Sequence, residues 1–397
     1  MMSIVLSAFS SILLARMLGP EAQGKWSLSN NFISTCTMIF AFGLPSSVLS
    51  TFRRSGLDEH QFMKSLLRYF LLIIILSAFL LCVFYFMPNW QFLTSDLIRK
   101  KWMLPAFLFS MGCQTAMSIL YPILDAKNRF GLVTFNKLFG NLLFLLLIIF
   151  LLYFSESTVQ LIWIWIIFCF IQLIQVLIIF YHLVFTVSFQ PGNKTISVAQ
   201  LIVKSGWVYF MIDIFQRFNF RLDIWFLSYY KDLNQVGIYS VASSLSLFVL
   251  VKPRTSQRFL INSMIVNHDQ ENRKRVKAEI TKILMTLLSI FPVILIFSYV
   301  LFYYILGNKY HESFFIFLCL LFGIYILSVT YPISGYFLFK GYKYCNLLAS
   351  MAGLVINFIG NYVWIPAFGI WGAVFSSIFT YSAISMVLAF CFIKTKD

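Results

Sequence analysis

The sequence predicts an all-α, polytopic membrane protein with about twelve transmembrane helices in two parallel six-helix halves around a central cavity. Composition, the spacing of apolar stretches and an internal repeat support this prediction. Of the 397 residues, 60% are hydrophobic and only 11% are charged, whereas soluble proteins carry about 25% charged residues. This composition excludes a water-soluble globular enzyme.

Apolar stretches long enough to cross a bilayer, which takes roughly 20 residues each, follow one another along the whole chain. They are expected to be helices, because irregular or open-edged backbone cannot cross hydrocarbon without unpaired polar groups. The first stretch has no basic segment before it and no small-residue cleavage site, so we expect a span and not a removable signal peptide. The predicted spans are 2–18, 26–50, 66–87, 102–124, 133–154, 159–186, 203–228, 236–260, 283–306, 313–338, 344–365 and 370–393.

The net charge of +16 is explained first by topology. Of the 30 Lys and Arg residues, 21 fall on one side of the predicted spans and seven on the other. This bias places the even-numbered loops and both termini in the cytoplasm. The longest break, 251–282, is expected to be an amphipathic linker at the inner membrane surface. Nucleic-acid binding is therefore not expected.

A shift of 213 residues aligns the chain with itself. It places Gly24, in GKWSL, on Gly237, in GIYSV, and it places Gly140 on Gly353. A similar distance separates the first predicted span from the seventh. The repeat predicts two halves, 1–190 and 191–397, which insert in the same orientation because each has an even number of spans. Parallel halves of this kind are a transporter architecture.

Five segments of the chain carry a resemblance to a known family: ARMLGPEAQGKWSL, FGLPSSV, RLDIWFLSYYKDLNQVGIYSVA, LGNKYHES and NFIGNYVWIPAFGIWGAVFSS. Together they resemble the polysaccharide repeat-unit flippases, the Wzx-type members of the MOP exporter superfamily, which also contains the multidrug and toxin extrusion (MATE) transporters. This resemblance implies a protein of the bacterial inner membrane that moves an undecaprenyl-diphosphate-linked oligosaccharide from the cytoplasmic to the periplasmic leaflet by alternating access. The glycan would belong to O-antigen, capsule or a related polymer. Lipid II flippases of the superfamily match less well, because they have two further helices.

No catalytic signature is found, neither G-x-x-x-x-G-K-[ST] nor H-E-x-x-H, so we expect a transporter and not an enzyme, with no cofactor. The histidines and cysteines lack ligand spacing, so no metal site is expected. The partners implied by the resemblance are the lipid-linked glycan, membrane lipids, and the polymerase and chain-length regulator of the same pathway.

The seventh span is exceptional because it contains four charged residues. Asp213, Arg217 and Arg221 are four residues apart and form one helical stripe, with Asp223 beside it. A charge near mid-bilayer costs about 2.5–3.5 kcal/mol, so the stripe is expected to face a cavity or to pair internally. Two interpretations remain open. Asp213–Arg217 and Arg221–Asp223 pairs would fix helix packing, whereas cavity-facing arginines would bind the diphosphate through paired hydrogen bonds and leave a carboxyl to take up a proton.

Other candidates lie in the first half. By the resemblance, Arg16, Arg53 and Arg54 are positions where the first two helices would meet the pyrophosphate. Arginines at helix ends also reach to lipid headgroups and set topology, which is the ordinary alternative. On the fifth span, three residues are expected to present a polar face to sugar hydroxyls: Asn136, Lys137 and Asn141. Four other amides are expected to join helices by hydrogen bonds: Gln172, Gln175, Asn357 and Asn361.

Two other functions compete with the flippase. A gradient-driven exporter of small cationic drugs predicts a cavity dominated by carboxylates, whereas the charges inside the spans here have no net negative sign. A membrane-embedded glycan polymerase or ligase predicts a large periplasmic loop with catalytic residues. The predicted outer loops are short, and the longest loop is expected to be cytoplasmic.

Overall fold

The computed structural model describes residues 2–45, 47–48, 58–86, 103–154, 161–185, 197–201, 206–264 and 269–395. These residues are almost entirely helical, which confirms the predicted fold class. The chain divides into two compact units, Met1–Leu18 with Lys25–Ile214, and Gly19–Gly24 with Phe215–Asp397. The boundary falls inside one helix, α9, and not at the junction of the predicted halves.

The helices of the first unit, within its described residues, correspond to the first six predicted spans. The third to sixth predicted spans each match one helix, because a continuous apolar run in a membrane satisfies its backbone only by helical hydrogen bonds. The helices of the first unit are α1 (Met2–Ala41), α3 (Glu59–Phe86), α5 (Met103–Ala126), α6 (Phe130–Phe154), α7 (Leu161–Phe185) and the short α8 (Val198–Leu201).

The second unit contains the later helices, and α9 (Trp207–Tyr230) joins the two units. Two predicted spans are interrupted here. The eighth is formed by α10 and α11 with a 3-10 turn between them, and the tenth by α13 and α14. The helices are α10 (Leu233–Leu247), α11 (Val251–Met264), α12 (Asp269–Val300), α13 (His311–Ser328), α14 (Tyr331–Lys340), α15 (Lys343–Phe368) and α16 (Ile370–Lys394).

Helix α1 contains the first predicted span and, as far as Ala41, the second. Its 40 residues would extend about 60 Å, twice the thickness of the hydrocarbon core. Gly19 has φ 70° and ψ 172°, and Pro20 follows it, so the helix is two arms, 2–18 and 20–41. Glycine tolerates this positive φ, and proline suits the first turn of the second arm. Ten helical runs among the described residues are apolar and long enough to span. With the second arm of α1 and the charged α9, they account for the twelve predicted spans.

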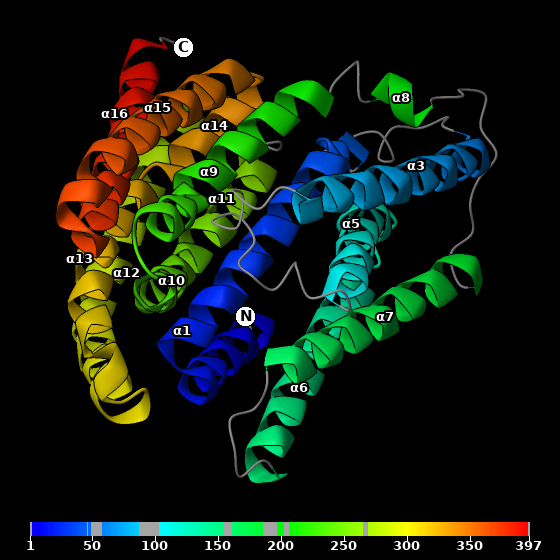
Figure 1. Ribbon diagram of the computed structural model, residues 1–397. Coiled ribbons are helices and arrows are strands. Elements are labelled where there is room, and N and C mark those ends of the chain that lie inside the picture. The colour runs from blue at the N-terminus through cyan, green and yellow to red at the C-terminus, as the bar shows by residue number, and fades with distance from the viewer. Residues whose placement is uncertain are drawn as a thin grey trace. The chain divides into compact units, whose positions relative to one another are not determined.

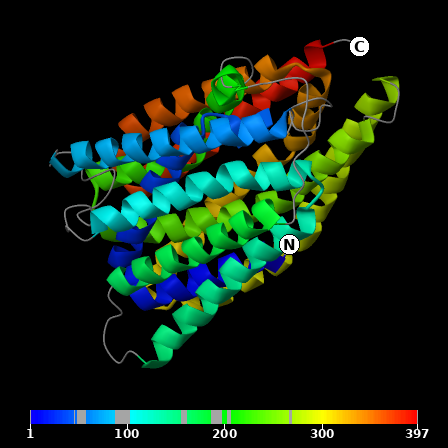
Figure 2. The same ribbon diagram turned by 90° about the vertical axis from the view of Figure 1, so that its right-hand side faces the viewer.

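Ion pairs and hydrogen bonds show which helix ends lie at the same level. Lys127, just after α5, forms a 2.5 Å ion pair with Glu59 at the start of α3. The two helices lie side by side and are antiparallel (Figure 2). In the second unit, Arg273 near the start of α12 donates to the carbonyl oxygen of Phe392 near the end of α16. Each contact joins ends that the distribution of basic residues predicts to share one membrane surface.

Helix faces that do not pack against other helices are also apolar. On α3, Leu71, Ile75 and Phe79 are four residues apart and are 64%, 66% and 69% exposed. Such a stripe on a helix that packs on its other side is suited to lipid contact. In the core of the first unit, the rings of Trp26 and Trp165 are in contact, with centroids 4.6 Å apart and an interplanar angle of 49°. The arrangement is that of a membrane protein, with apolar residues both inside and outside.

Helices α15 and α16 form an antiparallel pair that packs along its length (Figure 1). Small residues permit the close approach. A Cβ added to Gly360 would lie 2.7 Å from Ser376 Oγ, and one added to Gly372 would overlap the backbone of Trp364. Small residues at helix contacts are the usual means of close packing in membranes, where no hydrophobic effect drives helices together.

Two glycines form a reciprocal contact within the second unit. A Cβ on Gly24 would overlap the carbonyl oxygen of Leu233, and a Cβ on Gly237 would overlap the carbonyl oxygen of Pro20. The 213-residue offset relates Pro20 to Leu233 and Gly24 to Gly237. The two segments related by the offset therefore meet through equivalent positions, Gly24 and Gly237, and at each of these positions only glycine fits.

We expect the Gly237→Ala substitution to lower the stability of the protein by about 1–3 kcal/mol, because the methyl group must displace backbone. The control is Gly112→Ala in α5, where an added Cβ meets no atom within 4 Å. That change should be neutral or stabilise by about 0.5–1 kcal/mol, since alanine favours a helix over glycine. Melting temperatures in detergent measure both effects. Equal melting of the two variants would contradict the close contact.

Candidate functional site

The charged residues of α9 lie in a helix whose remaining side chains are largely apolar. Asp213, in the part of α9 that belongs to the first unit, is half-buried. Arg217, Arg221 and Asp223 belong to the second unit, and only Asp223 is fully buried, with 1% exposure. The helical period places Arg217 and Arg221 on one stripe, as the sequence predicts.

Asp223 is held by hydrogen bonds from two neighbouring helices. Its Oδ2 accepts from the hydroxyl of Tyr239 on α10 and, at 3.3 Å, from Ser377 Oγ on α16. Its Oδ1 accepts from the backbone N–H of Ile224 at 2.8 Å. Tyr239 and Ser377 are themselves completely buried, and their oxygens are 3.2 Å apart. A buried carboxyl requires such partners, because its desolvation is otherwise costly.

Arg221 lies beside this carboxyl. Its Nη1 donates to Ser244 Oγ on α10 at 3.2 Å. It interacts electrostatically with Asp223 and also with Tyr239 and Tyr381. The guanidinium therefore belongs to the same polar group of side chains on α9, α10 and α16, which we call the α9 cluster: Arg221, Asp223, Tyr239, Ser244, Ser377 and Tyr381. The packing interpretation of the sequence pairs Arg221 with Asp223, and the two groups interact electrostatically.

Arg217 lies one helical turn before Arg221 and is only partly buried. The two guanidinium groups interact electrostatically with each other, and the sign of this interaction is repulsive. Two cations one turn apart on a spanning helix attract an anion, since an anion that contacts both reduces their repulsion and their desolvation cost. The stripe is therefore suited to a phosphate or diphosphate.

The candidates at the ends of the first two spans are only partly described. Arg16 is exposed, near the end of the first arm of α1. Arg53 and Arg54 lie outside the described residues.

Asn136 on α6 is completely buried. Its Nδ2 donates to the carbonyl oxygen of Gln175 on α7 at 3.0 Å and to the hydroxyl of Tyr121 on α5 at 3.3 Å. Gln175 Nε2 returns a 3.0 Å hydrogen bond to the carbonyl oxygen of Asn136. The two amides join α6 and α7, as predicted for Gln175. For Asn136, these bonds are those of a packing residue and not of a side chain open to sugars.

The other two polar residues of α6 point to different surroundings. Lys137 is exposed, and its Nζ lies 4.6 Å from the centroid of the Tyr121 ring. Asn141 Nδ2 donates to the carbonyl oxygen of Ser3 on α1 at 2.6 Å. The three residues expected to share one sugar-binding face thus have separate contacts.

Several members of the α9 cluster are missing from the sequence prediction. Tyr239, Ser377 and Tyr381 are polar residues within apolar spans, and tyrosines of spans are expected at interfaces or facing lipid. Nothing in one sequence shows that these three converge on Asp223. The available signal was the buried carboxyl itself, since it must find donors on neighbouring helices.

A family described as polysaccharide biosynthesis protein matches residues 1–252, which is more than half of the chain. The chain belongs to this family. No curated protein matches it in sequence.

Solved structures show the fold of this family member. A lipid II flippase MurJ in an inward closed conformation matches with a TM-score of 0.75 and 17% identity, over 99% of this chain and 86% of that one. An inward-facing multidrug resistance MATE family transporter of the MOP superfamily matches with a TM-score of 0.71 and 13% identity, over 99% and 96%. The eukaryotic MATE transporter AtDTX14 matches with 0.66 and 12%, over 100% and 94%. At these identities the likeness is one of fold, and it is the MOP transporter fold that the resemblance implies.

We expect the Tyr239→Phe substitution to lower the stability by about 1–3 kcal/mol, because it removes a donor from the buried carboxyl of Asp223. Tyr362→Phe is the matched control, since Tyr362 on α15 is 60% exposed. In a double-mutant cycle with Asp223→Asn, the combined loss should be smaller than the sum of the single losses. Melting in detergent gives the values. Additive losses would show that the hydrogen bond contributes nothing.

Proposed function

We propose that this protein translocates an undecaprenyl-diphosphate-linked oligosaccharide repeat unit from the cytoplasmic to the periplasmic leaflet by alternating access. Its pathway would be that of O-antigen, capsule or a related glycan in a bacterial inner membrane, with both termini in the cytoplasm. The observation that carries the proposal is the pair of arginines, Arg217 and Arg221, on a spanning helix of a polysaccharide biosynthesis family member.

The arginines suit a diphosphate better than they suit a structural role alone. A guanidinium offers planar paired donors to phosphate oxygens and stays charged. Arg217 and Arg221 lie one turn apart, and their electrostatic interaction is repulsive. Two neighbouring cations in a membrane helix are costly, and a substrate that brings two phosphates offsets this cost.

The alternative transporter function, export of drugs, is less well supported. An exporter of cations needs an accessible carboxylate, whereas Asp223 is buried and accepts hydrogen bonds from Tyr239 and Ser377. Asp213 is the half-buried carboxyl of α9. In the proposal it takes up a proton as the substrate site opens and closes.

The candidate residues of the first half are assigned either to secondary contacts with the substrate or to helix packing. Arg16 and Lys137 are exposed and are assigned to polar contacts with the substrate, together with Arg53 and Arg54. The amides of the same half are assigned to helix packing, because both have partners on neighbouring helices: Asn136 and Asn141.

Arg217→Ala and Arg221→Ala are each expected to reduce surface glycan more than tenfold in a strain whose own copy of the gene is deleted. Lipid-linked repeat units should accumulate and, in spheroplasts, stay inaccessible to a membrane-impermeant glycosidase. Arg258→Ala is the matched control, an exposed arginine on α11, and should support normal glycan.

Protein levels in the membrane must be equal for the comparison to hold. Normal surface glycan in both α9 variants would refute the arginine site. Repeat units that are accessible to the glycosidase would indicate a polymerase or ligase, and drug sensitivity with normal glycan would indicate an exporter.

A further inference from the structure

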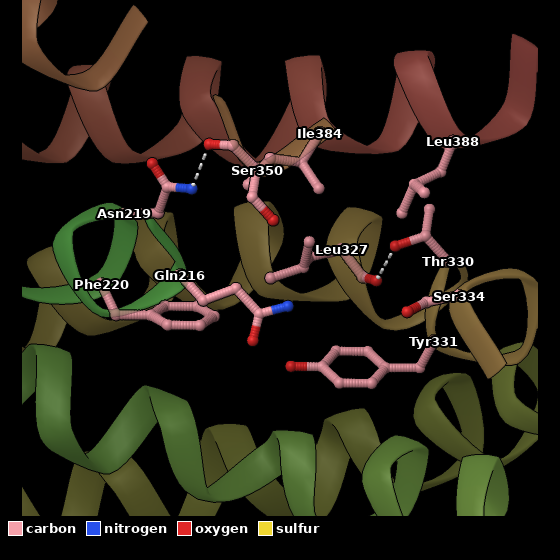
Figure 3. A pocket seen from close by; sticks show the side chains of 10 residues that line it. All are labelled: Gln216, Asn219, Phe220, Leu327, Thr330, Tyr331, Ser334, Ser350, Ile384 and Leu388. Carbon is pink, nitrogen blue, oxygen red and sulfur yellow. Dashed lines mark hydrogen bonds between the residues drawn. The ribbon is translucent and has the colours of Figure 1, made fainter. Parts of the chain in front are cut away.

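A pocket lies within the second unit where the tenth span is broken (Figure 3). Helix α13 ends at Ser328, and α14 begins at Tyr331 with Pro332 in its first turn. Proline has no N–H to continue the helical hydrogen bonds of α13, and here the span is broken into two helices. Broken helices in transporters are a common location for substrate sites, because irregular backbone is tolerated only where it lines a cavity or is buried in protein.

The pocket is partly open, and about 400 Å³ in and in front of it, open solvent included, is not filled by atoms. Side chains from α9, α13, α14, α15 and α16 line it, and they include amides, hydroxyls and aliphatic groups. Among the described residues that line it, none is charged. In small-molecule sites, apolar walls and a few polar groups determine the orientation of the ligand. The ligand it fits is therefore neutral, polar and compact.

The amides come from α9. Asn219 is 1% exposed, and its Nδ2 donates to the carbonyl oxygen of Ser350 at 2.9 Å. Its Oδ1 has no hydrogen-bond partner in the part of the chain that the structure describes. A buried acceptor without a partner is costly, and a hydroxyl donor in the pocket would satisfy it. Gln216, one turn earlier, is exposed.

An aromatic pair lies next to Gln216. Figure 3 shows the Gln216 side chain between the ring of Phe220 and the hydroxyl of Tyr331. Arg254 on α11 donates to that hydroxyl at 3.3 Å, and its guanidinium lies 5.9 Å from the centroid of each ring. Since the tyrosine oxygen accepts from Arg254, its own proton can be donated to a ligand. Arg254 thus positions Tyr331.

We propose that this pocket binds a neutral sugar ring of the lipid-linked glycan. Sugar hydroxyls match the donors and acceptors of Gln216, Asn219 and Tyr331, and the aliphatic wall contacts the apolar face of the ring. Gln216 directly precedes Arg217, about 100° around α9, so sugar and diphosphate would contact adjoining faces of one helix. The inference rests on the proposed function, which it extends to a sugar site.

The test compares three lipids on the purified full-length protein in nanodiscs, with dissociation constants measured by native mass spectrometry. They are undecaprenyl diphosphate, and the same lipid with one N-acetylglucosamine or one galactose. At least one sugar should tighten binding to the wild type about three- to tenfold. Gln216→Leu and Tyr331→Phe should abolish this gain and leave the dissociation constant of the bare lipid unchanged. Tyr325→Phe is the matched control, because its hydroxyl bonds to Leu287 outside the pocket.

The outcomes separate the two proposals. Equal binding of all three lipids to the wild type, or an equal loss for all three in the pocket variants, would overturn the sugar site. Arg217→Ala should weaken all three lipids. If Arg217→Ala leaves the dissociation constant of the bare lipid unchanged, while the tighter binding of the sugar-bearing lipid still depends on Gln216, the arginine site is wrong and the sugar site is supported. Melting temperatures check folding, and Gln216→Leu changes an exposed side chain.

Discussion

The burial of charge on α9 is the constraint on which the second unit depends. A carboxyl and a guanidinium within an apolar span are tolerated only if neighbouring helices supply polar partners. Asp223 receives them from Tyr239 on α10 and Ser377 on α16, and Arg221 receives one from Ser244 on α10. The consecutive helices α9 and α10 and the distant α16 are thereby joined around one polar cluster, and a change in any partner affects all three.

Close packing makes these contacts possible. Ser377 reaches α9 from a helix that packs tightly on α15, where Gly360 and Gly372 leave no room for a side chain. Gly353 of α15 plays a similar part, since a Cβ there would lie 2.6 Å from Ile384 of α16. In lipid, small residues and interhelical hydrogen bonds together hold helices at fixed distances. The polar cluster and the glycines are parts of one arrangement.

The spans could be predicted from the sequence because hydropathy and the need for internal hydrogen bonds determine them locally. Ends agree to within a few residues for most helices, as for 344–365 and Lys343–Phe368. The stripe of Arg217 and Arg221 followed from the helical period alone. The partners of Asp223 could not be predicted, because they depend on which helices meet. The break in the tenth span left a signal, Pro332, but a proline within an apolar run can also kink a continuous helix.

The two faces of α9 differ in chemistry, and this difference has a consequence for specificity. In the proposed function every lipid-linked glycan would carry the same diphosphate, so the residues that bind it would not need to vary with the sugar. A neutral pocket with amides and hydroxyls discriminates strongly, because a sugar that lacks a hydroxyl leaves a buried acceptor such as Asn219 Oδ1 unpaired. Selectivity among glycans would therefore depend on the pocket at the break of the tenth span, while Arg217 and Arg221 would supply affinity common to all of them.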